Sequence, residues 1–455
     1  MNGKLIRGLT LIDAISIVIG TIIGTGVFLK TSTMALLVGS PFYVLLAWVV
    51  AGLLSLTGAL AYAELGSLMP HAGGEYVYLK EGHGDMWAFL YGWMRFWIGS
   101  PGSIAAYAVG AMTFMSGVMD LSFLGGKVLA SVLVIILFSL LNCLSVAFGG
   151  KLQAIMTGLK ISMILGISLG IFFFSKTGNF NHLFEAPVNH GGFMGWSAFA
   201  SAILAALWAY DGWCNLTMVA GEIQNPKKNI PLSLIIGMFS ILFIYALANL
   251  AFFYALPLSE IMSANSSAHP DALPVATKAA LTFLGSSGVS VLSGAFVFSA
   301  LGAMNGSILT GSRVPFAMAR DGLFFKQLAV VSKTTHVPVA SIIVQALVAI
   351  LLASTGTFDQ LTDYVIFSSW IFYAMVTSVV FVLRKRKPLE PRPYKAFGYP
   401  VLPMVFIILG VFLLINTIVT SPGATMVGLG FIFSGIPCYF WFKKRRFLHL
   451  SHRSE

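Results

Sequence analysis

The sequence predicts an all-α integral membrane protein with about twelve transmembrane helices. Its composition gives the first two indications: of 455 residues, 57% are hydrophobic and only 9% are charged. A soluble globular chain carries about 25% charged residues. So few charged side chains cannot cover a soluble protein of this size, and the surplus apolar surface has to face lipid. The third indication is the distribution of lysine and arginine along the chain.

Apolar stretches long enough to cross a bilayer recur along the whole chain. A transmembrane helix needs about 20 mainly apolar residues, and hydropathy divides this sequence into twelve such stretches. The first and eighth are longer than a straight crossing needs, so they are expected to be tilted, broken or extended into solvent. The predicted spans cover residues 9–37, 42–68, 88–118, 128–147, 151–175, 193–220, 232–256, 279–312, 337–354, 360–383, 400–420 and 424–442.

The basic residues predict the orientation of these helices. With the N-terminus in the cytoplasm, 21 of the 27 lysines and arginines fall in cytoplasmic tails and loops, and four fall near the outer side. The positive-inside rule therefore favours an even number of spans with both termini in the cytoplasm. Because loops and tails are short, residues 1–455 are interpreted as a single polytopic membrane domain.

Composition and motifs exclude several other classes of function. The net charge of +11 does not indicate nucleic-acid binding, because the basic residues lie between hydrophobic spans. The three cysteines, Cys143, Cys214 and Cys438, lie in apolar runs without the spacing of metal ligands or of a disulfide framework. The spans contain neither a zinc-protease nor a nucleophile-elbow pattern. We therefore expect no enzyme activity, no catalytic residues, no metal and no cofactor.

Two predicted spans carry residues that interrupt a helix at mid-depth. In the first span, three glycines lie within residues 20–26, and each weakens a helix by about 1 kcal/mol relative to alanine. In the sixth span, Asp211 and Gly212 lie between aromatic residues, at a depth where a charge is costly. Freed backbone groups are tolerated there only where they are buried in protein or line a cavity. Alternatively, the glycines only let neighbouring helices pack closely.

The two interrupted spans occupy matching places in two halves of the chain. Gly26 precedes Pro41 by 15 residues, and Asp211 precedes Pro226 by 15 residues. Spans one and six lie an odd number apart, so equivalent spans have opposite orientations. Interrupted helices in such inverted repeats indicate the substrate site of a secondary transporter.

The helix ends at these breaks offer partial charges of both signs. Where the first span resumes, the free N–H groups of residues 24–26 form a partly positive end suited to a carboxylate. Where it stops, carbonyls near Ile22 are suited to an ammonium group, and those of Trp208 and Ala209 complete that pole. A carboxylate and an ammonium group a few ångströms apart describe a zwitterion, so the breaks predict an amino acid site.

Several spaced motifs resemble those of the amino acid–polyamine–organocation superfamily. The run GTIIGTGVF resembles its first-helix signature, and AYAELG with GGEY resembles the region after its second helix. The segment AYDGW and the motifs after it resemble the L-amino acid transporter branch, the light-subunit family of heteromeric transporters. Within this branch, the chain resembles bacterial alanine–serine–cysteine exchangers. The motifs lie at residues 20–28, 61–66, 73–76, 209–213, 222–231, 305–307 and 312–322.

This resemblance implies a fold, a transport mode and a set of binding residues. The fold is LeuT-type, with two inverted five-helix repeats at approximately 9–175 and 193–383, discontinuous helices 1 and 6, and two further helices at 400–442. The implied activity is sodium-independent exchange of neutral L-amino acids by alternating access across a plasma membrane. The compact loops indicate that this membrane is bacterial. The family binds the substrate carboxylate at positions matching Gly24, Thr25 and Gly26, and the ammonium group at positions matching Ile22, Trp208 and Asp211.

Two departures from the family pattern bear on partners and on the site. Residues 119–127 lack the cysteine through which eukaryotic members bind a heavy subunit, so no covalent heavy-chain partner is expected. Asp211 replaces the glycine of some members. It is expected either to cap the second half of helix six or to tune the charge or proton affinity of the site.

A lysine at mid-depth is a candidate for coupling. Lys160 lies midway along the fifth span, where it should face acceptors. The resemblance places it where sodium sits in sodium-coupled relatives, so it is expected to bind carbonyls near Gly20 and the hydroxyl of Ser307 and to replace the ion. Two alternatives stay open: the lysine only holds helices together, or it loses its proton on desolvation, which keeps proton coupling open.

Aromatic residues flank the break in the sixth span. Trp208 and Tyr210 either pack in the core or close over the substrate as a gate. A bulky Trp208 beside the site would limit the volume of the substrate side chain, which favours alanine, serine and cysteine. The expected partners are therefore small neutral L-amino acids and membrane lipid. The alternative function is a proton-coupled amino acid or polyamine symporter of the same superfamily.

Overall fold

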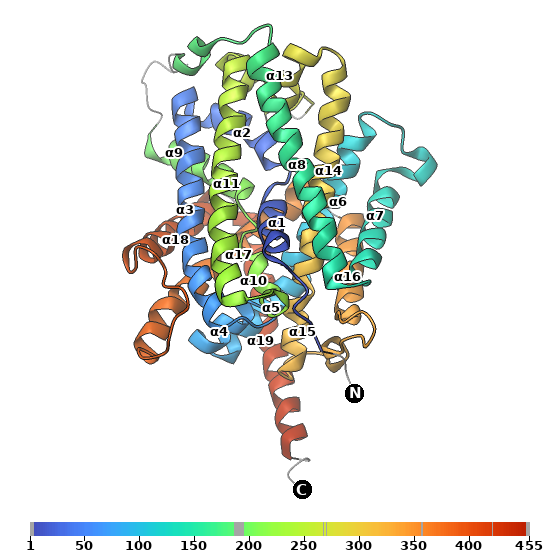
Figure 1. Cartoon of the computed structure of the whole chain (residues 1–455), viewed down its shortest axis with the longest axis vertical. Helices are drawn as coiled ribbons and strands as arrows, with labels where there is room; N and C mark the ends of the chain where they lie inside the picture. The colour runs from blue at the N-terminus through green and yellow to red at the C-terminus, as the bar shows by residue number, and fades with distance from the viewer. Residues whose placement is uncertain are drawn as a thin grey trace.

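The computed structural model describes residues 4–185, 195–266, 268–269, 271–355, 358–420 and 422–451, and this part of the chain is helical (Figure 1). Within these ranges, the β structure is an isolated bridge between Leu9 and Ile223. Long helices run along the vertical axis of Figure 1, and both ends of the chain lie at the same end of the bundle. The predicted all-α class is confirmed for the described residues.

The first helical segment is interrupted at its glycines. α1 (Leu11–Ile22) begins with a capping box, in which the Thr10 side chain accepts from the Asp13 N–H and the Asp13 carboxylate accepts from the Thr10 N–H. Residues 23–25 then separate α1 from α2 (Gly26–Val38). The break therefore falls inside the run 20–26 that the sequence marks.

The rest of the first half contains six α-helices and three short irregular turns. A proline in the first turn starts the first of these helices, at a position where its missing N–H is tolerated. In chain order the elements are α3 (Pro41–Leu68), α4 (Glu75–His83), α5 (Asp85–Met94), the π-helical turn η1 (Arg95–Gly99), α6 (Ser100–Ser116), η2 (Ser122–Leu124), α7 (Gly126–Asn142), α8 (Val146–Phe174) and η3 (Phe180–Phe184).

The second half begins with another interrupted segment. α9 (Trp196–Ala209) ends in a turn of residues 210–214, and α10 (Asn215–Met218) follows it. The remaining elements are η4 (Ala220–Glu222), α11 (Pro226–Ala255), α12 (Leu258–Met262), α13 (Val275–Leu284), α14 (Ser287–Gly311), α15 (Arg313–Arg320), η5 (Lys326–Ala329), α16 (Val339–Thr355), α17 (Phe358–Arg386), α18 (Val401–Thr420) and α19 (Pro422–Ser451).

Several predicted span boundaries are wrong. The fourth span ends at Asn142 instead of 147, and the seventh starts at Pro226 instead of 232. The fifth span was predicted to start at residue 151, but its helix starts at Val146, because the Ser145 side chain caps it. The eighth predicted span, 279–312, runs over the end of α13 and the whole of α14. A turn separates these helices, because Gly285 has a φ of 60° that ends α13.

Eight described helical segments are long and apolar enough to cross a membrane, by length and composition. Four apolar helices, α7, α9, α13 and α16, are shorter. An integral membrane protein accounts for this set, while the count of twelve spans stays a prediction. The predicted start of the sixth span, at residue 193, lies outside the described residues. The eight segments are Leu11–Val38, Pro41–Leu68, Val146–Phe174, Pro226–Ala255, Ser287–Arg320, Phe367–Arg386, Val401–Val419 and Thr425–Arg446.

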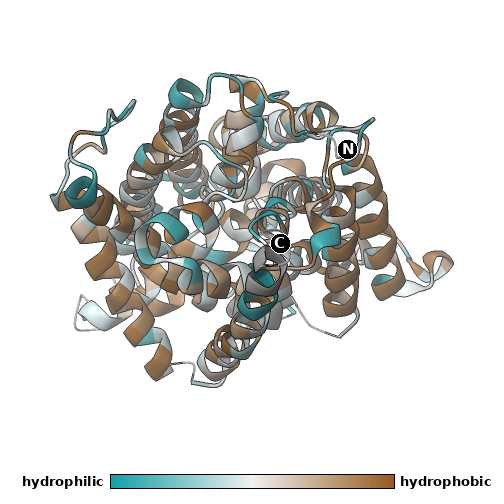
Figure 2. Cartoon of the chain, turned by 90° about the horizontal axis from the view of Figure 1, so that it is seen from below, coloured by the Kyte–Doolittle hydropathy of each residue, from teal (hydrophilic) through white to brown (hydrophobic). Residues whose placement is uncertain are grey.

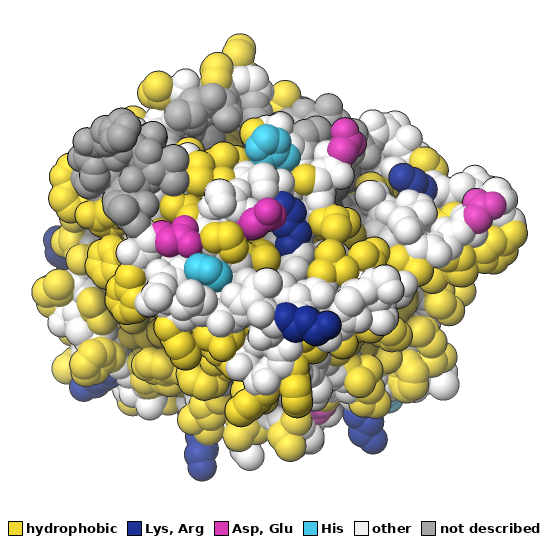
Figure 3. Space-filling model, turned by 90° about the horizontal axis from the view of Figure 1, so that it is seen from above, with side chains coloured by type: hydrophobic (Ala, Val, Ile, Leu, Met, Phe, Trp, Pro, Cys, Tyr) yellow, Lys and Arg dark blue, Asp and Glu magenta, His cyan; other side chains and the backbone are white. Residues whose placement is uncertain are grey.

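Burial separates a central segment from peripheral ones. The apolar window in Leu11–Val38 is 83% buried, whereas that in Val401–Val419 is 22% buried. α1 packs against α8, α11 and α14, so the first break lies inside the bundle. On the outside, apolar side chains such as Phe412 and Val419 stay exposed, as a lipid-facing surface requires. Figure 2 shows hydrophobic residues on the outer helices, and Figure 3 shows few charged side chains on the top face.

Candidate substrate site

The gap between α1 and α2 presents backbone carbonyls that side chains of other helices bind. The Nζ atom of Lys160, in α8, lies 2.7 Å from the carbonyl oxygens of both Gly20 and Ile23. The Ser299 hydroxyl, in α14, donates to the carbonyl of Gly24 at 2.9 Å and lies 3.2 Å from that of Ile23. Lys160 is 1% exposed, so peptide carbonyls take the place of water around its ammonium group.

The surroundings of Lys160 differ from the prediction in one residue. Ser307 is buried in α14, but the bonds described for the ammonium group go to the carbonyls of Gly20 and Ile23. The hydroxyl at the break comes from Ser299, about two turns earlier in the same helix. The lysine also depends on Gly302, because a Cβ atom there would lie 2.6 Å from Lys160 Cε. Sequence reasoning missed both Ser299 and Gly302.

The break after α9 touches the break after α1. Gly212 has a φ of 119°, a conformation that favours glycine. A Cβ atom on Gly212 would lie 2.9 Å from the carbonyl oxygen of Thr21. The Thr21 hydroxyl in turn lies 3.0 Å from the Gly212 carbonyl oxygen and 2.7 Å from that of Ile17 in its own helix, and it shares its one proton between them. The two interrupted segments are therefore in direct contact.

The residues predicted to bind a carboxylate are brought together at the start of α2. Gly24, Thr25 and Gly26 are all buried, and a Cβ atom on Gly26 would lie 2.7 Å from Ala209 Cβ. Thr25 Oγ1 is a buried hydroxyl for which the described residues provide no hydrogen-bond partner. The first N–H groups of a helix also lack intrahelical partners. This corner can therefore receive an anionic group.

A tyrosine that sequence reasoning missed bridges both breaks. The hydroxyl of Tyr245, in α11, lies 2.9 Å from the Ala209 carbonyl and 3.3 Å from the Ile22 carbonyl. Both carbonyls belong to the pole predicted to receive an ammonium group. The hydroxyl carries one proton, so it donates mainly to the closer carbonyl. Tyr245 lies inside a regular apolar helix, and no local sequence signal marks it.

The prediction that Asp211 caps the second half of the interrupted helix is wrong. Because the unwound turn extends past Gly212, α10 begins only at Asn215, with Cys214 in the N-cap position and no side-chain cap bond. The Asp211 carboxylate instead accepts from the Tyr373 hydroxyl at 2.8 Å. It is partly exposed, which leaves its predicted effect on the charge of the site open.

The two aromatic residues at the second break are buried. Trp208 is 8% exposed and Tyr210 is 1% exposed. The Tyr210 ring packs against Trp48 and Tyr245, with centroids 5.9 and 5.1 Å away. This packing agrees with the core alternative for Tyr210, and a gating role of either residue stays a prediction.

A buried ion pair lies at the end of the bundle that carries the termini. Arg313 Nε and Nη2 donate to the two carboxylate oxygens of Glu222 at 2.7 and 3.0 Å, and both side chains are fully buried. The Leu9 N–H donates to the Glu222 carbonyl at 3.0 Å, and the Gln224 N–H donates to the Leu9 carbonyl at 2.9 Å. These bonds tie the segment before α1 to the segment after α10.

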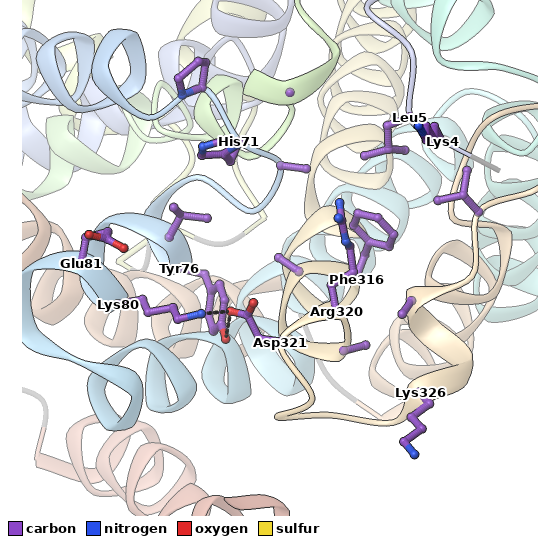
Figure 4. Close-up of a pocket in the computed structure, with 18 of the residues that line it drawn as sticks. Lys4, Leu5, His71, Tyr76, Lys80, Glu81, Phe316, Arg320, Asp321 and Lys326 are labelled. Carbon is purple, nitrogen blue, oxygen red and sulfur yellow. Dashed lines mark hydrogen bonds and ion pairs between the residues drawn. The ribbon is translucent and has the colours of Figure 1, made fainter. Parts of the chain in front are cut away.

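A large pocket lies not at the breaks but at the end of the bundle that carries the termini. It has a volume of about 1050 Å³ and lies between the N-terminal segment, α4 and α15 (Figure 4). Its lining contains no residue of 20–26 or 208–213. The cavity predicted between the two breaks is therefore not this pocket.

A multi-pass helical bundle with two touching helix breaks is typical of secondary transporters. Comparison with protein families supports this class, because the amino acid permease family matches residues 9–442. The chain therefore belongs to the amino acid permease family. The family resemblance given by its sequence motifs is confirmed.

Several relatives align over nearly the whole chain. The serine/threonine exchanger SteT of Bacillus subtilis is 33% identical over 442 residues, which cover 96% of this chain and 97% of SteT. The human b(0,+)-type amino acid transporter 1 is 31% identical, over 97% of this chain and 89% of that protein. The human cystine/glutamate transporter is 30% identical, over 98% of this chain and 88% of that protein. All three are named as transporters or exchangers, not as enzymes.

Proposed function

We propose that this chain exchanges small neutral L-amino acids across the plasma membrane by alternating access and without sodium. In this proposal, residues 1–455 form one transport domain with twelve spans of LeuT type and with both termini in the cytoplasm. The aligned SteT protein is by name a serine/threonine exchanger from a bacterium. That name favours small neutral substrates and a bacterial membrane for this chain.

The direct contact between the two helix breaks carries the proposal. The N–H groups at the start of α2 and the unpartnered Thr25 hydroxyl would bind the substrate carboxylate. The carbonyls of Ile22, Trp208 and Ala209 would bind its ammonium group. Tyr245 already donates to one of these carbonyls, so it would share the ammonium-binding pole with the substrate. Peptide dipoles alone can then hold a zwitterion.

Lys160 supports independence from sodium. Its ammonium group contacts two carbonyls of the first break at 2.7 Å, as a monovalent cation bound there would. A covalently attached cation needs no free ion to fill the position. In this proposal Lys160 couples substrate binding at the break to movement of α1.

The close packing around the breaks favours small substrates. Gly26 has no room for a methyl group beside Ala209, and the bulky Trp208 adjoins this contact in the chain. A substrate with a short side chain therefore displaces the least protein. Alanine, serine and cysteine fit this requirement.

Counterflow in proteoliposomes tests the proposal. The purified chain is reconstituted into vesicles loaded with unlabelled alanine, and uptake of labelled alanine is measured with sodium or with choline outside. We expect uptake that requires internal amino acid, is equal in both salts, and is inhibited by serine and cysteine more than by leucine or lysine. Uptake that requires sodium would contradict the role of Lys160.

A proton-coupled symporter is the second candidate, because Asp211 places a partly exposed carboxylate at the break. The same vesicles distinguish it. Uptake of alanine or of a polyamine into empty vesicles, driven by an inward proton gradient, would support the symporter and contradict obligatory exchange.

A further inference from the structure

The large pocket at the end of the bundle that carries the termini is lined by an excess of basic side chains. Five cationic residues line it: Lys4, Arg7, Lys80, Arg320 and Lys326. The carboxylates in its lining are those of Glu81 and Asp321. The pocket therefore has a net positive charge, and its volume of about 1050 Å³ holds more than a few water molecules.

Internal pairing leaves most of this positive charge free. Lys80 Nζ lies 2.6 Å from Asp321 Oδ2, and the Tyr76 hydroxyl donates to the same oxygen at 2.9 Å (Figure 4). Asp321 is thus already neutralised. Among the described residues, no carboxylate lies within ion-pair distance of Arg7 or Arg320. The guanidinium of Arg320 instead lies 5.7 Å from the centre of the Phe316 ring.

The free cations come from segments that lie far apart in the sequence. Arg7 lies in the N-terminal segment, and Arg320 ends α15. Arg7 also lines an adjoining pocket of about 240 Å³, to which the first turn of α11 adds Lys227 and Lys228. Both lysines are exposed. The fold therefore gathers unneutralised basic side chains around one hollow.

We propose that this pocket binds a phosphate-bearing anion. Arginine guanidinium groups present fork-shaped donors that match phosphate oxygens, and lysines add point charges around them. Basic pockets on the cytoplasmic side of membrane helices also bind anionic lipid headgroups. The shared chemistry is a phosphate group, and its source is either an anionic phospholipid or a free phosphate compound. The site lies apart from the helix breaks, so it does not depend on the proposed substrate.

Binding to the purified full chain tests the proposal. In neutral detergent at constant ionic strength, calorimetry measures binding of inorganic pyrophosphate. Native mass spectrometry in parallel measures retention of phosphatidylglycerol and of phosphatidylcholine. The test variant carries two substitutions, Arg7→Gln and Arg320→Gln, both at exposed positions. The control is Lys385→Gln with Lys395→Gln, which removes two exposed positive charges outside the pocket.

We expect that at least one phosphate probe binds the unmodified chain. Its affinity should fall by about tenfold or more in the test variant and stay unchanged in the control. If pyrophosphate binds and loses affinity only in the test variant, the ligand of the pocket is a free phosphate compound. Selective retention of phosphatidylglycerol over phosphatidylcholine, with the same dependence, assigns a lipid headgroup. An equal loss of affinity in the test variant and the control would show only a general effect of charge and would overturn the proposed site. Binding of neither probe would overturn it as well. Both variants are first compared with the unmodified chain by thermal unfolding, and Arg320→Lys gives a charge-preserving check.

Discussion

The ammonium nitrogen of Lys160 lies 2.7 Å from the carbonyl oxygen of Gly20, although the two residues lie 140 positions apart in the chain. This contact joins α8 to the end of α1, where the helical hydrogen-bond ladder stops. In the proposed function, this contact gives the break a cation that is covalently part of the protein.

Lys160→Ala should abolish most of the exchange activity. Without the ammonium group, the carbonyls of Gly20 and Ile23 lose a charge-assisted partner in a buried site. We expect counterflow at least about tenfold slower. Lys151→Ala, at an exposed position of the same helix, is the control and should retain activity. A folded Lys160→Ala protein that exchanges at the unmodified rate would refute the coupling role.

Tyr245→Phe should change the apparent affinity for alanine. The substitution removes the hydroxyl that lies 2.9 Å from the Ala209 carbonyl and leaves the ring in place. One such bond is worth roughly 0.5–1.5 kcal/mol, so we expect up to about a tenfold change in KM. Tyr254→Phe in the same helix serves as the comparison and should have little effect. Identical KM values for all three proteins would remove Tyr245 from the site.

Gly26→Ala should destabilise the contact between the breaks. The new methyl group would lie 2.7 Å from Ala209 Cβ and 2.9 Å from Ala209 Cα, which is closer than Cβ atoms approach other atoms. We expect loss of exchange and a lower midpoint of thermal unfolding. Gly158→Ala has open space around the new atom and should raise stability by up to about 1 kcal/mol. Equal stability of the two variants would contradict the close approach.

Glu222→Gln should be strongly destabilising. It leaves the guanidinium of Arg313 buried without its bidentate partner, a change that typically costs about 3–5 kcal/mol. Glu260→Gln breaks the pair with Lys278, in which Glu260 is 56% exposed, and should cost less than about 1 kcal/mol. Thermal unfolding in detergent compares the two. Similar midpoints for both variants would show that the buried pair does not hold this end together.

Trp208→Ala should widen substrate selectivity. If the indole limits the volume available to the substrate side chain, its removal should let leucine and phenylalanine compete with labelled alanine. Competition in the counterflow assay, with Trp441→Ala at an exposed position as control, measures this. An unchanged order of competitors would contradict the size limit.

The sequence predicts those parts of the fold and the site that have a local cause. Apolar runs predict the helices, and the glycines of residues 20–26 predict the first break, because each acts within its own helix. The position of Lys160 midway along a predicted span indicates that its ammonium group needs hydrogen-bond acceptors. The break after α9 is likewise marked by Gly212, whose φ of 119° extends the turn beyond the predicted cap at Asp211.

Features that depend on packing between helices leave no local trace. Tyr245 and Ser299 lie inside regular helices, α11 and α14, and only tertiary packing brings their hydroxyls to the breaks. The resemblance implies Ser307 as the partner of Lys160, whereas the hydroxyl at the break belongs to Ser299 in the same helix. The sequence alone does not tell which turn of this helix faces the first break. The basic pocket is assembled from four separate segments, so no single motif contains it.

The most direct test of the central claim is an experimental structure of the purified chain with alanine bound. We expect density for the ligand between the two breaks, with its carboxylate at the N–H groups of Gly24, Thr25 and Gly26. Its ammonium group should lie at the carbonyls of Ile22 and Trp208. Alanine bound elsewhere, with residues 20–26 and 208–213 not in contact with it, would contradict the account.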